Sequence, residues 1–213
     1  HESPDNYATL MYSDVSMSST CEMVYNIIKD MDPNGFTPDI SECLYTGIMT
    51  DTGSFRYPAT TPATHRAIAH LIETGASGTE IHQRIYDSAS FSRLKLLGLT
   101  LSNLKQIPNL PVVYMTLSQK ELNSCDYKKG DTEGFVNYGL SIEGIIFSCI
   151  MIENEGIIKI SFRSQGEFSV NDFARSYFNG GGHHNAAGGM SSDSIETTVA
   201  RFIESVQEVA HKF

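Results

Sequence analysis

The sequence predicts an α/β protein built in two parts. Up to about residue 103, apolar side chains recur at helical spacing between helix start and stop signals. Pro108 and Pro111 end this region, and the rest of the chain alternates strand-like segments with helices. A chain of 213 residues has room for one large domain or two small ones. We therefore expect a mainly helical first part and a second part that contains a sheet.

Helix start signals recur through the first part. Ser19 and Glu22 have capping-box spacing, while Thr37-Pro38 and Thr61-Pro62 place proline at the first helical position. The apolar stripes expected to face the core are Met23, Val24, Ile27, Ile28 and Met31 in the first helix, then Ile40, Cys43, Leu44, Gly47 and Ile48 in the second.

A further helix is expected over residues 91–107, with leucines at 94, 97, 101 and 104. This spacing is that of a coiled-coil seam, but an ordinary core helix explains it better. The same segment also suits a helix that joins the two parts.

The second part is predicted to hold the strands 112–117, 144–152 and 157–162, the last two joined by a turn at Asn154-Glu155-Gly156. Strand alternation places Lys159, Ser161 and Arg163 on one polar face. A helix that begins near Ser169 leads directly into a glycine run, and a last helix begins near Asp193.

The run Gly180-Gly181-Gly182-His183-His184-Asn185-Ala186-Ala187-Gly188-Gly189 is the segment around which the chain is organised. Three glycines permit a turn with positive φ angles whose bare N–H groups form a concavity for an anion. His183 and His184 add side-chain donors. Glycine runs are often only flexible loops, but this order of residue types favours a phosphate or nucleotide contact. The histidines could instead bind metal, although adjacent histidines point apart, and we expect substrate contact.

Composition limits the partners. The net charge of −10 disfavours long nucleic acid, whose binding depends on neutralised phosphates, but it allows a short nucleotide held by local cations. No apolar run approaches a membrane span, and the four cysteines are widely spaced. We expect a cytoplasmic protein with reduced thiols and no membrane partner. The sequence leaves open whether it acts alone or as a homodimer.

Three segments together resemble a known family. The glycine-histidine run resembles the signature of the C-terminal substrate-binding domain of DHH-family phosphoesterases, and Ser161-Phe162-Arg163-Ser164 resembles a strand end of that domain. Thr50-Asp51-Thr52-Gly53-Ser54-Phe55-Arg56-Tyr57 resembles the last metal-binding motif of the DHH catalytic domain. The subgroup of nano-RNases and pAp phosphatases is the most similar. The resemblance implies that residues 1–103 are the latter part of a catalytic domain, with a parallel sheet and helices. Residues 104–213 would form a smaller α/β substrate-binding domain.

The resemblance also implies roles for single residues. Asp51 would be a catalytic residue and the last aspartate ligand of a two-metal site, because a carboxylate suits Mn²⁺ or Mg²⁺. Arg163 and Ser164 would bind phosphate together with Gly181, Gly182, His183 and His184. His1 resembles the second histidine of the Asp-His-His motif, with a role in phosphate contact or proton donation; a histidine introduced by cloning is the alternative. If the resemblance holds, the preceding metal ligands are absent from this chain, and it alone would be nearly inactive.

The predicted function is metal-dependent hydrolysis of short oligonucleotides, pAp or linear dinucleotides to mononucleotides. Two alternatives stay open. The first is a non-catalytic nucleotide-binding or RNA-binding module, since the same C-terminal domain is appended to alanyl-tRNA synthetases; Asp51 and its motif argue against it. The second is an exopolyphosphatase or pyrophosphatase, against which the glycine-histidine run argues.

Overall fold

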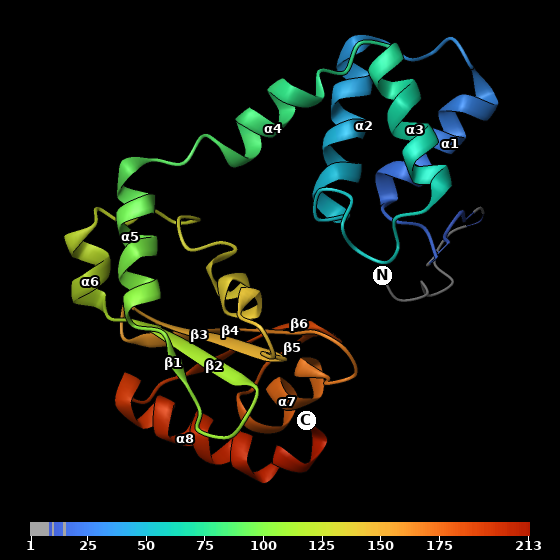
Figure 1. Cartoon of the computed structure of the whole chain (residues 1–213). Coiled ribbons are helices and arrows are strands. Elements are labelled where there is room, and N and C mark those ends of the chain that lie inside the picture. The colour runs from blue at the N-terminus through green and yellow to red at the C-terminus, as the bar shows by residue number, and fades with distance from the viewer. Residues whose placement is uncertain (1–8, 10, 15) are drawn as a thin grey trace. The chain divides into compact units, whose positions relative to one another are not determined.

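The computed structural model describes residues 9, 11–14 and 16–213, so His1 lies outside the described residues. It divides into two compact units, His1–Ser88 and Ala89–Phe213 (Figure 1). This division falls before the predicted boundary at residue 103, because helix α5 (Phe91–Ser102) packs on strand β2 (Val112–Leu117). Each unit has its own core. No helix in the described part of the chain has both the length and the apolarity needed to cross a bilayer.

The described part of the first unit folds into the helices α1 (Thr20–Met31), α2 (Pro38–Asp51), α3 (Pro62–Glu73) and α4 (Gly78–Tyr86). The predicted caps are confirmed, because the side chains of Ser19, Thr37 and Thr61 accept hydrogen bonds from first-turn amides. The core of this unit consists of Tyr25, Phe36, Leu44, Tyr45, Ile48, Met49, Ala67, Ile68, Leu71, Ala76 and Ile81.

The predicted apolar stripe of α1 is confirmed only in part, since Ile28 packs against the core. Val24, Ile27 and Met31 are exposed, whereas Glu22 and Tyr25 are buried. Glu22 accepts a hydrogen bond from the Thr64 hydroxyl of α3 at 3.0 Å and another from Ser18 Oγ. These hydroxyl partners allow the Glu22 carboxylate to be buried, so α1 directs Glu22 and Tyr25 to the interior in place of three of the predicted apolar residues.

The stripe of α2 is predicted in part. Leu44 and Ile48 are buried, but Ile40 and Cys43 are exposed, and Tyr45 and Met49 take their places in the core. Gly47 lies where a β-carbon would overlap Cys21 of α1, so it allows the two helices to approach closely.

The second unit contains a six-stranded mixed sheet with the order β1-β2-β3-β4-β6-β5. Its strands are β1 (Lys105–Gln106), β2 (Val112–Leu117), β3 (Phe147–Asn154), β4 (Ile157–Ser164), β5 (Gly181–His183) and β6 (Ala186–Ser191). Strands β2 and β3 are parallel, and every other neighbouring pair is antiparallel. The predicted turn is confirmed, since Glu155 and Gly156 have φ angles of 53° and 81°, as a two-residue hairpin loop requires. Strand β3 begins at Phe147, later than predicted.

Helices cover both faces of this sheet (Figure 1). On one face lie α7 (Val170–Tyr177) and α8 (Ile195–Glu208), over a core rich in phenylalanine that includes Phe147, Phe162, Phe173, Phe178 and Phe202. On the other lie α5, α6 (Gln119–Ser124) and the 3₁₀ helix η1 (Phe135–Ser141). The core beneath α5, α6 and η1 takes its strand residues from β2 and β3. Among the described residues, strands β4, β5 and β6 contribute no side chain to this core. That end of the sheet therefore has one face outside both cores.

The leucines of α5 do not form a coiled-coil seam, and the preferred prediction of an ordinary core helix is confirmed, with Leu97 and Leu104 packed against the core. Leu94 and Leu101 are exposed, while Leu96 and Thr100 are the buried residues of this helix. The helix packs as an ordinary amphipathic helix and ends at Ser102.

Candidate functional site

The turn that follows Asp51 has an uncommon backbone. Asp51 is the exposed last residue of α2, and Gly53, Ser54 and Phe55 then have φ angles of 56°, 61° and 66°. For a residue with a β-carbon the left-handed conformation costs about 1–2 kcal/mol. Such strain persists where the surroundings hold it, and it concentrates at functional sites. The backbone therefore supports the assignment of this segment as a site.

Side chains hold the strained turn in place. Thr52 Oγ1 accepts a hydrogen bond from the Phe55 amide at 3.0 Å and donates to Ile48 O at 2.7 Å. Ser54 Oγ lies 2.9 Å from His82 Nε2, and His82 Nδ1 lies 2.8 Å from the carbonyl oxygen of Gly78. A carbonyl can only accept, so Nδ1 carries the hydrogen, and Nε2 accepts the hydrogen of the Ser54 hydroxyl.

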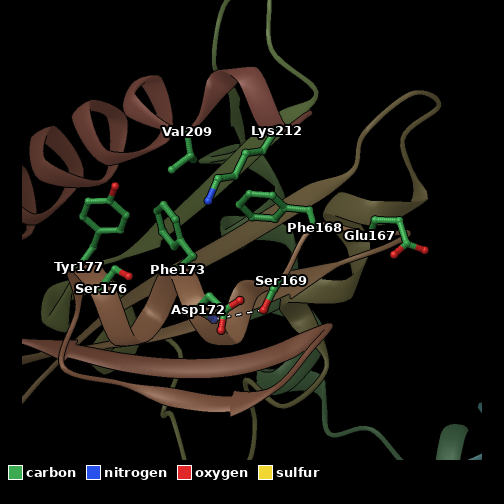
Figure 2. Close-up of a pocket in the computed structure, with 9 residues that line it drawn as sticks. All are labelled: Glu167, Phe168, Ser169, Asp172, Phe173, Ser176, Tyr177, Val209 and Lys212. Carbon is green, nitrogen blue, oxygen red and sulfur yellow. Dashed lines mark hydrogen bonds between the residues drawn. The ribbon is translucent and has the colours of Figure 1, made fainter.

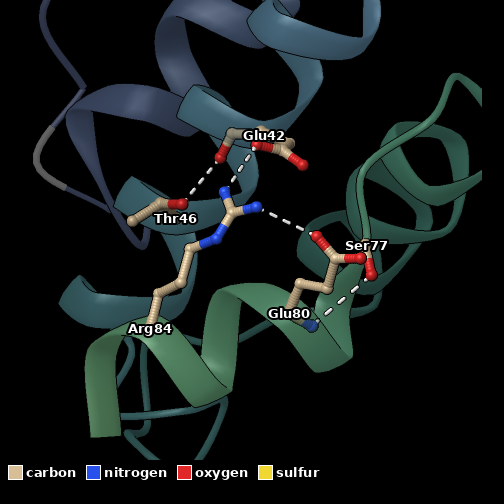
Figure 3. Close-up of polar contacts among 5 residues, drawn as sticks. All are labelled: Glu42, Thr46, Ser77, Glu80 and Arg84. Atoms are coloured by element: carbon tan, nitrogen blue, oxygen red, sulfur yellow. Dashed lines mark hydrogen bonds and ion pairs between the residues drawn. The ribbon is translucent and has the colours of Figure 1, made fainter. Parts of the chain in front are cut away.

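Helix α4, which carries His82, is joined to α2 by one ion pair, between Arg84 and Glu42, and a second pair of Arg84, with Glu80, lies within α4. Arg84 contacts Glu42 of α2 at 3.3 Å and Glu80 at 3.0 Å (Figure 3). Exposed pairs contribute about 0–1 kcal/mol each, so they orient α4 more than they stabilise it. The sequence analysis missed His82, because nothing in its local pattern distinguishes it from a surface histidine.

Asp51 fits a divalent cation as a single ligand. Its carboxylate is exposed and provides the hard oxygen donors that Mn²⁺ and Mg²⁺ take. Burial, followed by the charges of Asp51 and Cys43, raises the pKa of the Cys21 thiol. Within the described residues, no three His, Cys, Asp or Glu side chains gather as a metal site. Asp51 would thus be one ligand among others.

The glycine run is a hairpin, and the predicted open turn is wrong. Residues 181–183 form β5, which pairs with β6 across a turn at His184 and Asn185. The amide of Gly182 donates to Asn171 Oδ1 at 2.9 Å, and that of Gly180 donates to Ala174 O at 3.2 Å. These two amides are therefore bound within the protein and do not form a concavity for an anion.

The glycines of the hairpin differ in what they make room for. A β-carbon at Gly180 would overlap Gly188 O, one at Gly182 would overlap Ala186 O, and one at Gly189 would lie 2.8 Å from Phe178 Cβ. At Gly181 and Gly188 a β-carbon would meet nothing closer than 3.5 Å. Gly181 and Gly188 are cross-strand partners. Two neighbouring positions therefore lack a side chain although the packing would accommodate a β-carbon at each.

The sheet register brings Arg163 and His183 together. Arg163 pairs with Ala186, and Ala186 pairs with His183, so the three form one row across β4, β6 and β5. Cross-strand partners point to the same face, and the small side chain of Ala186 lies between the two basic residues in this row. The next rows on this face are Ser161, Gly188 and Gly181, then Lys159 and Met190.

This row pattern lies on the face of β4 that is outside the phenylalanine-rich core. Ile158, Ile160 and Phe162 are buried at 1%, 3% and 0% exposure on the opposite face, which confirms the predicted alternation. We call the face that bears residues 159, 161, 163, 181, 183, 186, 188 and 190 the open strip. It combines basic side chains with a floor of small residues, a combination that suits an anionic ligand.

Ser164 has a different role from the predicted phosphate contact. Its buried hydroxyl donates to Phe168 O at 2.6 Å and accepts from Asn185 Nδ2 at 2.9 Å. Since a hydroxyl has one hydrogen, none remains for a phosphate oxygen. Ser164 instead anchors the hairpin turn, next to the exposed His184, whose carbonyl accepts from the Val170 amide at 2.8 Å.

A separate pocket of about 230 Å³ lies between α7 and the C-terminal end of α8 (Figure 2). Phe168 and Phe173 are among its apolar lining residues, while Asp172 and Lys212 bring opposite charges to it. The Tyr177 hydroxyl at its edge donates to Glu208 at 3.0 Å, which raises the pKa of Tyr177. None of the predicted site residues that the structure describes lines this pocket. As predicted, Phe178 is buried and Tyr177 packs against the core.

Comparison with known proteins identifies the family. The DHHA1 domain model matches residues 109–212, which include Arg163 and the hairpin. A solved structure of an exopolyphosphatase-related protein from Bacteroides fragilis superposes with a TM-score of 0.95 at 38% identity, over 98% of this chain and 62% of that one. Residues 109–212 of the chain therefore belong to the DHHA1 domain family.

Two relatives are named bifunctional oligoribonuclease and PAP phosphatase NrnA. The protein from Bacillus subtilis is 30% identical over 88% of this chain and 59% of its own length. The protein from Thermus thermophilus is 29% identical over 98% of this chain and 62% of its own length. The chain thus spans about six tenths of the length of these two relatives.

Proposed function

We propose that the protein is a metal-dependent phosphoesterase that hydrolyses short oligonucleotides, pAp or linear dinucleotides to mononucleotides. The observation that carries this proposal is the open strip, where the register aligns Arg163 with His183 over Ala186. The names of the relatives from Bacillus subtilis and Thermus thermophilus support the substrate class. The strained turn after Asp51 supports a catalytic role for the first unit.

In this proposal the open strip binds the substrate. The Arg163 guanidinium contacts phosphate oxygens through its planar fork, and His183 adds a ring donor beside it. The bare backbone at Gly181 and Gly188 lets the ligand approach the sheet. From Arg163 to Lys159 the strip measures about 13 Å along β4, which favours short ligands. The net charge of −10 disfavours a longer strand outside the strip.

Asp51 would hold a divalent cation together with further ligands, which the described residues do not gather around it. Bound Mn²⁺ or Mg²⁺ would supply Lewis-acid activation of the phosphoryl group. Thr52, Ser54 and His82 keep the backbone after Asp51 in one conformation, so the carboxylate is presented in a constant orientation. The proposed role of His1, phosphate contact or proton donation, lies outside the described residues.

The test compares Asp51→Ala and Arg163→Ala on the longest natural form of the protein. Asp51→Ala is expected to abolish hydrolysis without changing the melting temperature by more than a few degrees, because the side chain is exposed. Arg163→Ala is expected to raise KM by about 10- to 100-fold, the effect of one lost charged hydrogen bond. The value of kcat should change little. The exposed Arg201 of α8 provides the matched control, Arg201→Ala, which should leave both constants unchanged.

A series of substrates from dinucleotides to long oligonucleotides completes the test. We expect kcat/KM to fall steeply with length. Equal efficiency along the series, or an Asp51→Ala variant with full activity at saturating Mn²⁺, would contradict the proposed function. Nucleotide binding without hydrolysis by the wild-type protein would favour the non-catalytic module.

A further inference from the structure

Arg175 of α7 lies at the edge of the open strip. Its Nε donates to Asn171 Oδ1 at 3.1 Å, and the same oxygen accepts the Gly182 amide at 2.9 Å. The β-carbon position of Gly181 lies 3.6 Å from Arg175 Nε and 3.8 Å from Arg175 Cγ. The Arg175 side chain therefore runs along the outer edge of β5, beside one of the two bare glycines.

Within the part of the chain that the structure describes, no carboxylate pairs with the Arg175 guanidinium, in contrast to that of Arg84, which contacts two carboxylates. The one hydrogen-bond partner of Arg175 there is the neutral amide of Asn171. That bond uses Nε–H and fixes the plane of the guanidinium, while the terminal amino groups keep their donors for a ligand. An exposed arginine with a fixed plane and a full charge is well suited to bind phosphate.

We propose that Arg175 binds a second phosphate of the ligand, beyond the one bound by Arg163 and His183. This inference rests on the proposed function of the open strip. Gly181 lies two strands away from Arg163 and one row along, a separation of about 12 Å between their α-carbons. Two long arginine side chains that approach from these positions can reach the two ends of one small nucleotide. Arg175 then makes the site selective for nucleotides that carry two phosphate groups.

The experiment titrates the full chain with AMP and with adenosine 3′,5′-bisphosphate by calorimetry, in EDTA so that no hydrolysis occurs. Arg175→Ala is expected to weaken bisphosphate binding by about 10-fold or more and AMP binding by less than about 2-fold. Arg175→Lys keeps the charge but loses the fork, so it should fall between the wild type and Arg175→Ala. Asn171→Ala frees the Arg175 side chain to rotate and should weaken bisphosphate binding several-fold.

The control variant is again Arg201→Ala, which removes an exposed cation whose guanidinium stacks on Phe178 with 5.2 Å between guanidinium carbon and ring centroid. It should bind both nucleotides as the wild type does. Equal weakening of both ligands by Arg175→Ala, or no weakening of either, overturns the role of Arg175. If Arg163→Ala also leaves both affinities unchanged, or if the wild type binds neither nucleotide, the open strip itself is overturned. The two failures are thus distinguishable.

Discussion

The turn after Asp51 and the β5–β6 hairpin both contain glycine, but they use it for opposite reasons. In the turn, Gly53 starts a left-handed run that Ser54 and Phe55 continue, so glycine serves conformation there. In the hairpin, Gly180 and Gly189 lack positive φ angles and instead make room for neighbouring backbone and for Phe178. A glycine motif can therefore indicate a strained backbone in one place and close packing in another.

This difference determines how each region should fail. The turn depends on side chains that are present, since Thr52 and His82 hold residues that would otherwise leave the left-handed region. The hairpin depends on side chains that are absent, because strand β5 lies against backbone atoms of β6. Removing a contact should loosen the turn, and adding one methyl group should disrupt the hairpin.

The largest expected effect follows from adding a methyl group to the hairpin. Gly180→Ala places a β-carbon on the carbonyl oxygen of Gly188, and that backbone atom cannot move without shifting β6. We expect a loss of about 3 kcal/mol in the free energy of unfolding of the second unit. Urea denaturation followed by circular dichroism measures it. The adjacent control Gly181→Ala should change the same quantity by less than about 0.5 kcal/mol, and a similar loss in both variants would contradict the packing role.

A smaller effect is expected from the turn. Ser54→Ala removes the hydrogen bond to His82 but keeps a β-carbon in the left-handed conformation, so we expect a loss of about 1 kcal/mol. Ser54→Gly loses the same bond but relieves the strain, and it should be more stable than Ser54→Ala by about 1 kcal/mol. Thermal unfolding of the two variants measures the difference. Equal stability would show that the φ angle of Ser54 carries no cost.

Local signals in the sequence were sufficient for much of the fold. Ser19, Thr37 and Thr61 predict helix starts because an N-cap bonds to amides within one turn. The alternation of buried and exposed side chains along β4 follows from strand geometry. The sequence of α1 alone could not predict which of its faces is exposed. Glu22 is buried because the Thr64 hydroxyl, which lies on α3, donates a hydrogen bond to its carboxylate. Likewise, His82 and Arg175 belong to their regions only through tertiary contacts with Ser54 and Asn171.

The glycine run shows where local reasoning stops. Its residue types predicted an anion site made of backbone amides. The proposed anion site is instead the open strip, where side chains of neighbouring strands would bind the anion. The amides expected to bind the anion are used by Asn171 and Ala174. The alignment of Arg163 with His183 depends instead on the pairing of three strands, which no single segment specifies.

The smallest expected change in stability provides the sharpest test of the comparison. A β-carbon at Gly188 would meet only Ile160 O at 3.5 Å, and the φ angle of Gly188 is ordinary. Gly188→Ala should therefore alter the free energy of unfolding by less than about 0.5 kcal/mol. The added methyl group stands on the open strip, between Ser161 and Gly181, where the ligand is proposed to approach the backbone. Nucleotide affinity should consequently fall several-fold in a variant that is as stable as the wild type. Calorimetric titration and urea denaturation of the same sample measure both quantities. An unchanged nucleotide affinity would show that the absence of a side chain at Gly188 does not matter for ligand binding. A loss of stability together with affinity would show that Gly188, like Gly180, lacks a side chain because the packing requires it.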